Sequence, residues 1–312
     1  MKKLAIFRFE ASATIGAGHA IRSCVLADAL REEGWDCKVV TTATTYDFIR
    51  NLERFERINP ENFQQLPLVC DLLVIDNYDL DYVYETRFRD YAEKIMVIDD
   101  LANRHHDCDI LLDQTYGRGA VEYKDLVPSH CKILAGSDYV LLRKEFREMR
   151  AKALEKRRNT TEIKRILISM GGSDQHAYIL KALSMIKYSD FEGVIDIVLG
   201  FDSVNLESIT NYIVELPNKC NIHVNADMSK LMYEADLAIG AAGTSVWERC
   251  CLGLPQVLIE IADNQKEIYR ALSDLVGLLG INEINSQNYL EFSNRFAKIV
   301  DGLGSEKVAG IL

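Results

Sequence analysis

The sequence is short of positive charge. Its 312 residues include 36 Lys and Arg against 47 Asp and Glu, which gives a formal net charge of −11. Nucleic-acid binding and docking on anionic membranes both depend on basic surfaces, so this balance argues against either partner. An anionic ligand would have to be held by local helix ends and a few cations.

Long hydrophobic runs are also missing. No stretch is long enough to cross a bilayer, and the apolar run after residues 1–3 is broken by Arg8 and Glu10, unlike a signal peptide. The eight cysteines are scattered and form no C-x-x-C pair. We therefore expect a cytoplasmic protein whose cysteines are reduced and mostly buried.

The sequence has no short repeat and no low-complexity tract, and its length exceeds one typical core. Apolar β-rich runs alternate with helical patterns in both halves, which is typical of parallel sheets covered by helices. Strands are expected at 4–8, 37–42, 71–75, 94–98, 109–112 and 132–134, and again at 165–170, 194–199, 221–224, 236–239 and 256–260. Helices are expected at 20–33, 45–55, 83–92 and 176–187.

This pattern predicts an α/β protein with two doubly wound, Rossmann-like domains that face a central cleft. The N-terminal domain is expected over 1–150 and the C-terminal domain over 160–285. The charged stretch 143–162 between them is interpreted as a solvated helix that fades into a linker. In the tail, 286–312, a helix over 289–300 is expected to cross back to the first domain.

A glycine-rich turn follows the first strand and ends in a histidine. Gly16 and Gly18 let the backbone approach an anion, and His19 adds a base that works near neutral pH. A dinucleotide fingerprint would need a third glycine where Ile21 stands and an acid after strand 37–42, so we expect no nicotinamide or flavin cofactor. The alternative is that His19 merely satisfies a neighbour at a helix N-terminus.

Two further loops suit a nucleotide. Strand 165–170 is followed by two glycines and two polar residues, namely Gly171, Gly172, Ser173 and Asp174. This loop suits contact with a diphosphate or a nucleoside, or, alternatively, Ser173 or Asp174 is a helix N-cap. Small and hydroxyl residues follow strand 236–239, namely Gly243, Thr244 and Ser245. Glu248 either forms a capping box with Ser245 or accepts hydrogen bonds from a ribose. Asn264 and Gln265, which follow strand 256–260, favour the ribose.

The stretch 99–109 is rich in Asp and His and has the composition of a metal site. Its adjacent side chains cannot all converge on one ion, so we expect no metal and favour a bound sugar or a hydrogen-bonded loop. The segment 76–78 follows a buried strand and should face the same cleft.

Taken together, these motifs are similar to those of the UDP-2,4-diacetamido-2,4,6-trideoxy-β-L-altropyranose hydrolases of pseudaminic acid biosynthesis, relatives of the GT-B glycosyltransferases. The matching segments span most of the chain, from Arg8 to Gln265, and include Gly16-x-Gly18-His19-x-x-Arg22, Asp76-Asn77-Tyr78, Asp99-Asp100-Leu101-Ala102-x-Arg104, Tyr139-x-Leu141-Leu142-Arg143-x-Glu145-Phe146, Gly171-Gly172-Ser173-Asp174 and Gly243-Thr244-Ser245-x-Trp247-Glu248. The sequence departs from the family at Glu10, usually Asp, and at Ser23, usually Cys.

The resemblance implies that His19 activates water and that Tyr78 assists beside the sugar. It also implies that Glu248 holds the ribose, with UDP in the C-terminal half and the sugar in the N-terminal half. The remaining substrate-binding candidates in the N-terminal part are Arg8, Glu10, Ser12, Gly16, Gly18, Arg22, Asp99, Arg104 and Arg143.

The activity so implied is hydrolysis of a UDP-sugar at C1, with C–O cleavage and inversion, in a pathway that serves flagellin glycosylation. The alternatives are a glycosyltransferase of the same architecture and a nucleotide-sugar binding protein without turnover. A small-molecule UDP-sugar is the partner expected, with no nucleic acid and no membrane, for a monomer or weak oligomer.

Overall fold

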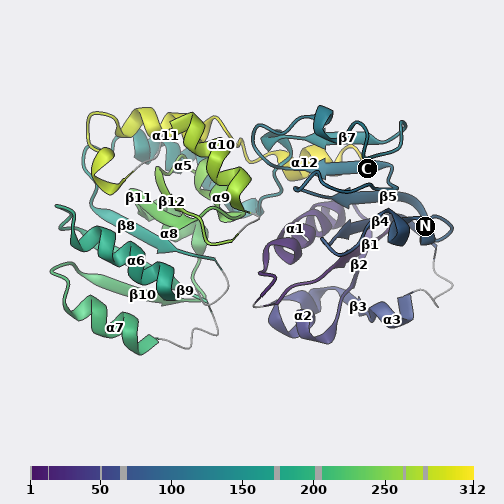
Figure 1. Ribbon diagram of the computed structural model, residues 1–312, viewed down its shortest axis with the longest axis horizontal. Helices are drawn as coiled ribbons and strands as arrows, with labels where there is room; N and C mark the ends of the chain where they lie inside the picture. The colour runs from purple at the N-terminus through teal and green to yellow at the C-terminus, as the bar shows by residue number, and fades with distance from the viewer. Residues whose placement is uncertain are drawn as a thin grey trace. The chain divides into compact units, whose positions relative to one another are not determined.

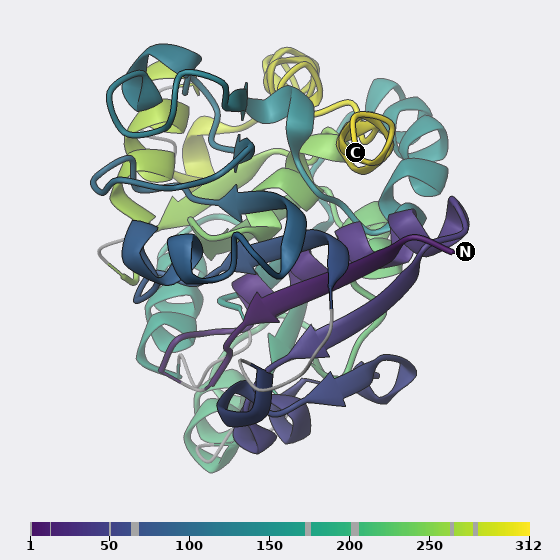
Figure 2. The same cartoon turned by 90° about the vertical axis from the view of Figure 1, so that its right-hand side faces the viewer.

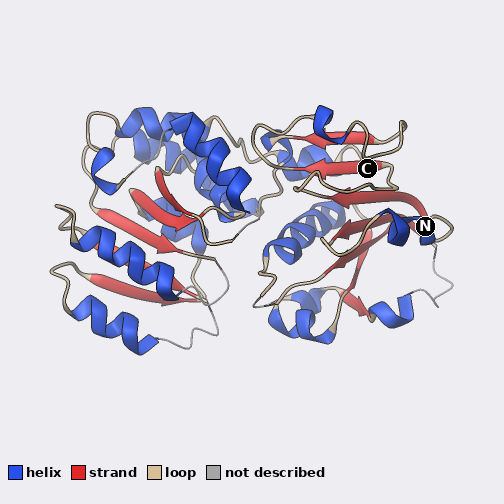
Figure 3. Cartoon of the chain, in the orientation of Figure 1, coloured by secondary structure: helices blue, strands red, loops and turns tan. Residues whose placement is uncertain are grey.

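The computed structural model describes residues 2–12, 14–49, 51–63, 69–171, 176–200, 206–262, 265–276 and 280–312. The chain divides into two compact units, and each has one sheet with helices packed against it (Figures 1 and 3). The first unit comprises Met1–Leu141 and Leu303–Leu312, and the second comprises Leu142–Gly302. The expectation of two doubly wound, Rossmann-like α/β domains is confirmed.

The sheet of the first unit is parallel throughout, with the strand order β3-β2-β1-β4-β5-β6-β7. Its strands are β1 (Leu4–Phe9), β2 (Asp36–Val40), β3 (Glu56–Ile58), β4 (Cys70–Asp76), β5 (Ala92–Ile98), β6 (Ile110–Asp113) and β7 (Lys132–Ala135). Only β3 has no counterpart in the sequence expectation, because it is a three-residue edge strand that buries only Ile58. The strand order reverses between β1 and β4, so the loops that follow these two strands diverge to opposite sides and open a crevice.

Both faces of this sheet are buried, which explains its continuous apolar strands. Successive residues of β1 alternate between the two cores, with Phe7 in the core under α1 and Ile6 in the opposite core. The helices are α1 (Gly18–Glu32), α2 (Ala43–Phe48), α3 (Pro60–Phe63), α4 (Tyr82–Arg87) and α12 (Gly304–Ala309), with short 3-10 turns at Leu52–Arg54, Ala120–Tyr123 and Ser137–Tyr139. Figure 2 shows α1 alongside β1 and β2.

The C-terminal tail differs from the expectation in one respect. The segment expected to cross back, 289–300, forms α11 (Tyr289–Ala297) and remains in the second unit, where Tyr289 and Phe296 are buried. The helix that joins the first unit is α12, whose Val308 lies in the core beside α1. Because α12 is short and has a single fully buried apolar side chain, its sequence carries little periodic signal.

The second unit has a five-stranded parallel sheet in the order β10-β9-β8-β11-β12, so its crevice lies between β8 and β11. Its strands are β8 (Arg165–Ser169), β9 (Val194–Leu199), β10 (Cys220–Val224), β11 (Leu237–Ala241) and β12 (Gln256–Ile259). The remaining helices are α5 (Lys144–Arg158), α6 (His176–Lys187), α7 (Leu206–Val214), α8 (Met228–Glu234), α9 (Ser245–Cys251) and α10 (Lys266–Val276), with a 3-10 turn at Ile281–Glu283.

Helix α5 is an integral part of the second unit, which corrects its interpretation as a solvated helix that fades into a linker. Phe146 and Ala153 are fully buried. Its basic side chains donate to carbonyls at the C-terminal ends of three other helices, where a cation is favourable. These contacts are Arg157 to Met232 O (2.6 Å), Lys156 to Glu234 O (2.8 Å), and Arg150 to Cys251 O and Ala297 O.

The structure also bears on membrane insertion and on the cysteines. Within the described ranges, no helix combines the length and the apolar character that a membrane span requires.

All eight cysteines are free thiols, and six of them are buried. The expectation that most cysteines are buried is thus met in the fold.

Candidate functional site

The glycine turn after β1 folds back on itself before α1 begins. The amide of Gly16 donates to Ser12 O (2.7 Å), and the amide of Ile15 donates to Ser12 Oγ (3.1 Å). Gly16 has φ +86°, a backbone conformation that favours glycine. Helix α1 then begins at Gly18, and no side chain caps it at Ala17. Its first-turn amides are therefore available to a ligand.

His19, in the first turn of α1, forms a buried dyad with Asp76. Its Nδ1 lies 2.5 Å from Asp76 Oδ1, and only 7% of the His19 side chain is exposed. Asp76 is the last residue of β4, so the switch in strand order brings it beside the turn after β1. Among the described residues, the hydrogen bonds of His19 use Nδ1, so Nε2 is the nitrogen that could bind a ligand or a water molecule.

Arg22 connects this dyad to a second carboxylate. One turn beyond His19, it donates Nε to Asp76 Oδ2 (2.7 Å), Nη2 to Asp76 Oδ1 (2.6 Å) and Nη1 to Asp100 Oδ2 (2.6 Å). Burial acts to raise the pKa of Asp76, but Arg22 and His19 outweigh burial and hold that pKa at about 2. Arg22 is itself buried, and its hydrogen bonds hold the carboxylates of Asp76 and Asp100 in place.

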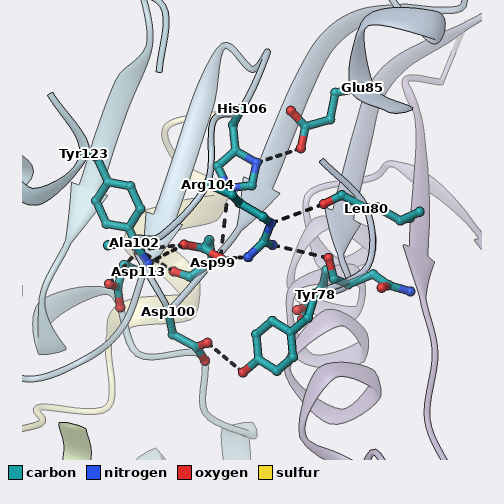
Figure 4. Close-up of polar contacts among 12 residues, drawn as sticks. Tyr78, Leu80, Glu85, Asp99, Asp100, Ala102, Arg104, His106, Asp113 and Tyr123 are labelled. Carbon is teal, nitrogen blue, oxygen red and sulfur yellow. Dashed lines mark hydrogen bonds and ion pairs between the residues drawn. The ribbon is translucent and has the colours of Figure 1, made fainter. Parts of the chain in front are cut away.

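Tyr78 completes the arrangement around His19. Its hydroxyl donates to Asp100 Oδ1 (2.7 Å), as Figure 4 shows. Its ring meets the His19 imidazole edge-on, with the centroids 4.4 Å apart. Burial acts to raise the pKa of Asp100, but Arg22 and Tyr78 outweigh it and the pKa is lowered. The two candidate catalytic side chains are therefore in contact, and each is oriented by an ionised aspartate that Arg22 also binds.

Asp99 and Arg104 lie in a buried network behind this site (Figure 4). Asp99 is fully buried and accepts from the amide of Ala102 (2.8 Å) and from Tyr123 OH (3.1 Å). Arg104 Nη1 forms an ion pair with Asp99 at 2.6 Å, and other nitrogens of Arg104 donate to Asn77 O and Leu80 O (3.3 Å each). These contacts tie the loop after β5 to the loop that carries Tyr78.

Several acidic and histidine side chains of 99–109 bind other residues of the protein. His106 Nδ1 lies 2.7 Å from the buried Glu85, and Asp107 and Asp109 both pair with Arg89 at 2.6 Å. Among the described residues, no group of three or more His, Cys, Asp or Glu is arranged to hold a metal ion. Of the two alternatives favoured from the sequence, the contacts are those of a hydrogen-bonded loop.

Arg8 and Glu10 at the end of β1 bind each other and the neighbouring loop. Arg8 Nη1 lies 2.5 Å from Glu10 Oε1, and Glu10 Oε2 accepts from Thr42 Oγ1 (2.8 Å) and Thr45 Oγ1 (2.5 Å). Burial acts to raise the pKa of Glu10, but the threonines and Arg8 outweigh it and lower the pKa. The residue that departs from the family pattern thus ties β1 to the start of α2.

In the second unit, the loops that follow β8 and β11 flank the crevice. Gly171 has φ +93°, which favours glycine, while Gly172, Ser173, Asp174 and Asn264 lie outside the described residues. A side chain at Gly243 would lie 3.5 Å from Gln265 Nε2, so the loops after β11 and β12 approach each other. Gln265 Oε1 also accepts from the amide of Ile261 (3.2 Å).

Glu248 does not form the capping box that the sequence allowed. Thr244 is the N-cap residue of α9 and makes no side-chain capping hydrogen bond, and Ser245 Oγ instead accepts from Arg249 Nη1 (3.2 Å). Glu248 Oε1 pairs with Arg143 Nη2 at 2.9 Å. Arg143 belongs to the second unit, although the sequence placed it in the first domain.

Arg249 is a buried residue that the sequence interpretation did not single out. Its guanidinium donates to Gln256 Oε1, Ala241 O (2.7 Å) and Ser245 Oγ. A Cβ at Gly240 would collide with Arg249 Nη1 and lie 2.8 Å from Ser169 O, so this glycine makes room for the arginine. Helix α9 also contains Glu248, directly before Arg249, so the sequence alone does not mark Arg249 as the buried charge.

Comparison with known proteins gives distant relatives. No protein-family model matches the chain. It is 26% identical over 253 residues to the UDP-2,4-diacetamido-2,4,6-trideoxy-beta-L-altropyranose hydrolase of Campylobacter jejuni, which covers 79% of this chain and 88% of that protein. It is 24% identical over 285 residues to the spore coat polysaccharide biosynthesis protein SpsG of Bacillus subtilis. This match covers 83% of this chain and 78% of that protein. An uncharacterised protein of Methanocaldococcus jannaschii is 26% identical over 282 residues, and the chain spans 57% of its length.

The solved structures decide the architecture. MurG of Acinetobacter baumannii superposes with a TM-score of 0.71 over 100% of this chain and 99% of its own, at 14% identity. The fold is GT-B. A UDP-GlcNAc 2-epimerase of Neisseria meningitidis shares this fold, with a TM-score of 0.59 over 100% and 99% of the two chains at 13% identity. The resemblance read from the motifs is therefore supported by both sequence and fold.

Sequence reasoning did not single out two residues of the network around His19. Asp76 and Asp100 were noted within motifs but were not among the candidate site residues. Each follows a buried strand, and carboxylates at the carboxyl ends of parallel strands are expected near a ligand. Their partner Arg22 lies 54 and 78 residues away in the chain, so no local pattern shows the pairing.

Proposed function

We propose that this protein hydrolyses a UDP-sugar to the free sugar and UDP, by attack of water on C1. The observation that carries the proposal is the buried His19–Asp76 dyad in a glycine turn. The similarity to the Campylobacter hydrolase over 79% of the chain supports the same reaction class. The substrate proposed is accordingly the altropyranose derivative named for that relative, in pseudaminic acid biosynthesis.

The dyad is suited to general-base catalysis. When the Asp76 carboxylate accepts a hydrogen bond from Nδ1–H, the lone pair of Nε2 can take a proton from water. The water oxygen then bonds to C1, the C1–O bond breaks with inversion, and UDP departs with the electron pair. Asp76 stays ionised and stabilises the imidazolium that forms.

The remaining groups act by binding and positioning. In this proposal the first unit binds the sugar, with Tyr78 beside it, while Asp99 and Arg104 hold the loops that carry these groups. The second unit binds UDP, with Glu248 accepting from the ribose hydroxyls. Gly171, Gly243 and Thr244 place backbone amides near the pyrophosphate, whose charge grows as the bond breaks.

The test is turnover and UDP affinity of His19→Ala. We expect hydrolysis to fall by about 10²–10⁴-fold, the usual contribution of a general base, with UDP affinity nearly unchanged. The matched control is His130→Ala, which removes a largely exposed histidine from the same unit and should retain full activity. Equal loss of turnover and affinity in His19→Ala would contradict the role.

Product analysis separates the alternatives. The GT-B neighbours include the glycosyltransferase SnogD of Streptomyces nogalater (TM-score 0.54, 13% identity) and the 2-epimerase, so a transferase of the same fold is the second candidate. Without an acceptor, quantitative free sugar and UDP favour hydrolysis. In ¹⁸O-labelled water, label in the sugar indicates C–O cleavage, and label in UDP would overturn the mechanism.

A further inference from the structure

Arg143 lies between two carboxylates at the start of the second unit. Nη2 is 2.9 Å from Glu248 Oε1, and Nη1 is 3.0 Å from Glu145 Oε1. The guanidinium also lies over the ring of Phe146, 4.9 Å from its centroid. These contacts hold the planar group in one orientation, and 36% of the Arg143 side chain remains exposed.

Glu248 lies in surroundings that oppose its charge. Its side chain is 13% exposed, and burial raises its pKa above the ordinary value, while Arg143 acts most strongly to lower it. The other charged group that lowers the pKa is Arg249, on the same helix, and Glu145 of α5 raises it. The thiol of Cys251, also in α9, is a further titratable neighbour. Arg143 is thus the main group that opposes the rise in the pKa of this carboxyl.

Resting on the UDP site proposed above, we propose that Arg143 is a positioning residue that orients the Glu248 carboxylate and keeps it ionised for the ribose. Within the part of the chain that the structure describes, Arg143 binds Oε1 and no group binds Oε2, so Oε2 is the oxygen proposed to accept from the ribose hydroxyls. A protonated carboxyl would retain only one good acceptor oxygen and would present a donor to groups that are themselves donors. The prediction is that Arg143 acts on UDP through Glu248 and not by direct contact.

Arginine suits this position better than lysine. The planar guanidinium of Arg143 pairs with both Glu145 and Glu248 and packs on the ring of Phe146. The ammonium of a lysine is a compact point charge and does not offer this geometry. Arg143→Lys should therefore keep the charge beside Glu248 but lose part of the orientation.

The experiment is calorimetric titration of UDP into the full-length wild type, Arg143→Met, Arg143→Lys, Glu248→Gln and the double variant, between about pH 5.5 and 8.5. In Arg143→Met, UDP affinity should fall at low pH and recover as the pH rises. The pH at which it recovers should be higher than in the wild type. Glu248→Gln should bind weakly without this pH dependence, and the double variant should match it. Arg143→Lys should restore most of the wild-type pH profile.

Several outcomes would overturn the inference. A loss in Arg143→Met that is the same at every pH, or that adds to the loss in Glu248→Gln, would mean that Arg143 contacts UDP itself. The control is Arg270→Met, which removes an exposed ion pair with Glu267 from the same unit and should bind UDP as the wild type does. Circular dichroism checks that each variant folds. Absence of UDP binding in the wild type would instead sink the proposed function.

Discussion

The two units each bury an arginine beneath the loops of their crevice, but in opposite electrostatic surroundings. Arg22 in the first unit donates to the carboxylates of Asp76 and Asp100; burial acts to lower its pKa, yet the carboxylates raise that pKa well above the ordinary value. Arg249 in the second unit donates to neutral acceptors, and burial lowers its pKa to about 10. One arginine belongs to an ionic network, and the other is bound by dipoles.

This difference matches the work proposed for each unit. An ionic network fixes the orientation of His19, which proton transfer requires. Neutral hydrogen bonds around Arg249 fix the shape of the loop between β11 and α9 without placing a strong local counter-charge beside a bound pyrophosphate. We infer that charge is arranged for chemistry in the first unit and for binding in the second.

The largest effect is expected from Asp76→Asn, which removes one of the two carboxylates that bind Arg22 in the first unit. An amide can donate to Nδ1 and stabilise the tautomer that carries its proton on Nε2, so the imidazole could no longer act as a base. We expect kcat to fall by about 10³-fold, with UDP affinity unchanged. Asp28→Asn, at an exposed ion pair with Arg54, serves as the control. A kcat within tenfold of the wild type would show that the carboxylate does not orient His19.

The next largest effect compares the two arginines directly. Arg22→Met leaves two carboxylates without their cation, which should lower the free energy of unfolding by about 3–5 kcal/mol. Arg249→Met leaves only neutral acceptors unpaired, at a cost of about 1–3 kcal/mol, partly offset because a charge is no longer buried. Urea unfolding of both variants measures the difference. A reversed order would refute the distinction between ionic and dipolar surroundings.

The smallest effect concerns the free energy of unfolding at acidic pH. The pKa of Asp76 falls from 3.8 to about 2 in the folded protein, so its ionisation stabilises the fold above pH 4 and this contribution is lost as pH falls toward 2. The difference corresponds to about 2 kcal/mol. The unfolding free energies of the wild type and Asp76→Asn should therefore converge on acidification. A constant difference between pH 5 and pH 2 would contradict the assignment.

Much of the fold could be predicted from sequence periodicity. Continuous apolar runs and the helical patterns between them predict two parallel sheets, and the glycine turns predict where ligands can bind. The misses have local causes: β3 and α12 are too short to show a pattern, and the basic residues of α5 have partners on α8, α9 and α11 that no local window contains.

The sequence by itself determined which loops lie near one another, because the carboxyl ends of parallel strands meet at the same edge of a sheet. Only the tertiary structure decided which side chains within those loops are in contact. Helix α1, the end of β4 and the loop after β5 contribute the network of His19, Arg22, Asp76 and Asp100, while Glu248 binds Arg143 instead of capping its own helix. The physical reason is that a buried charge is stable only beside a partner, and that partner is selected by distance in space and not by distance along the chain.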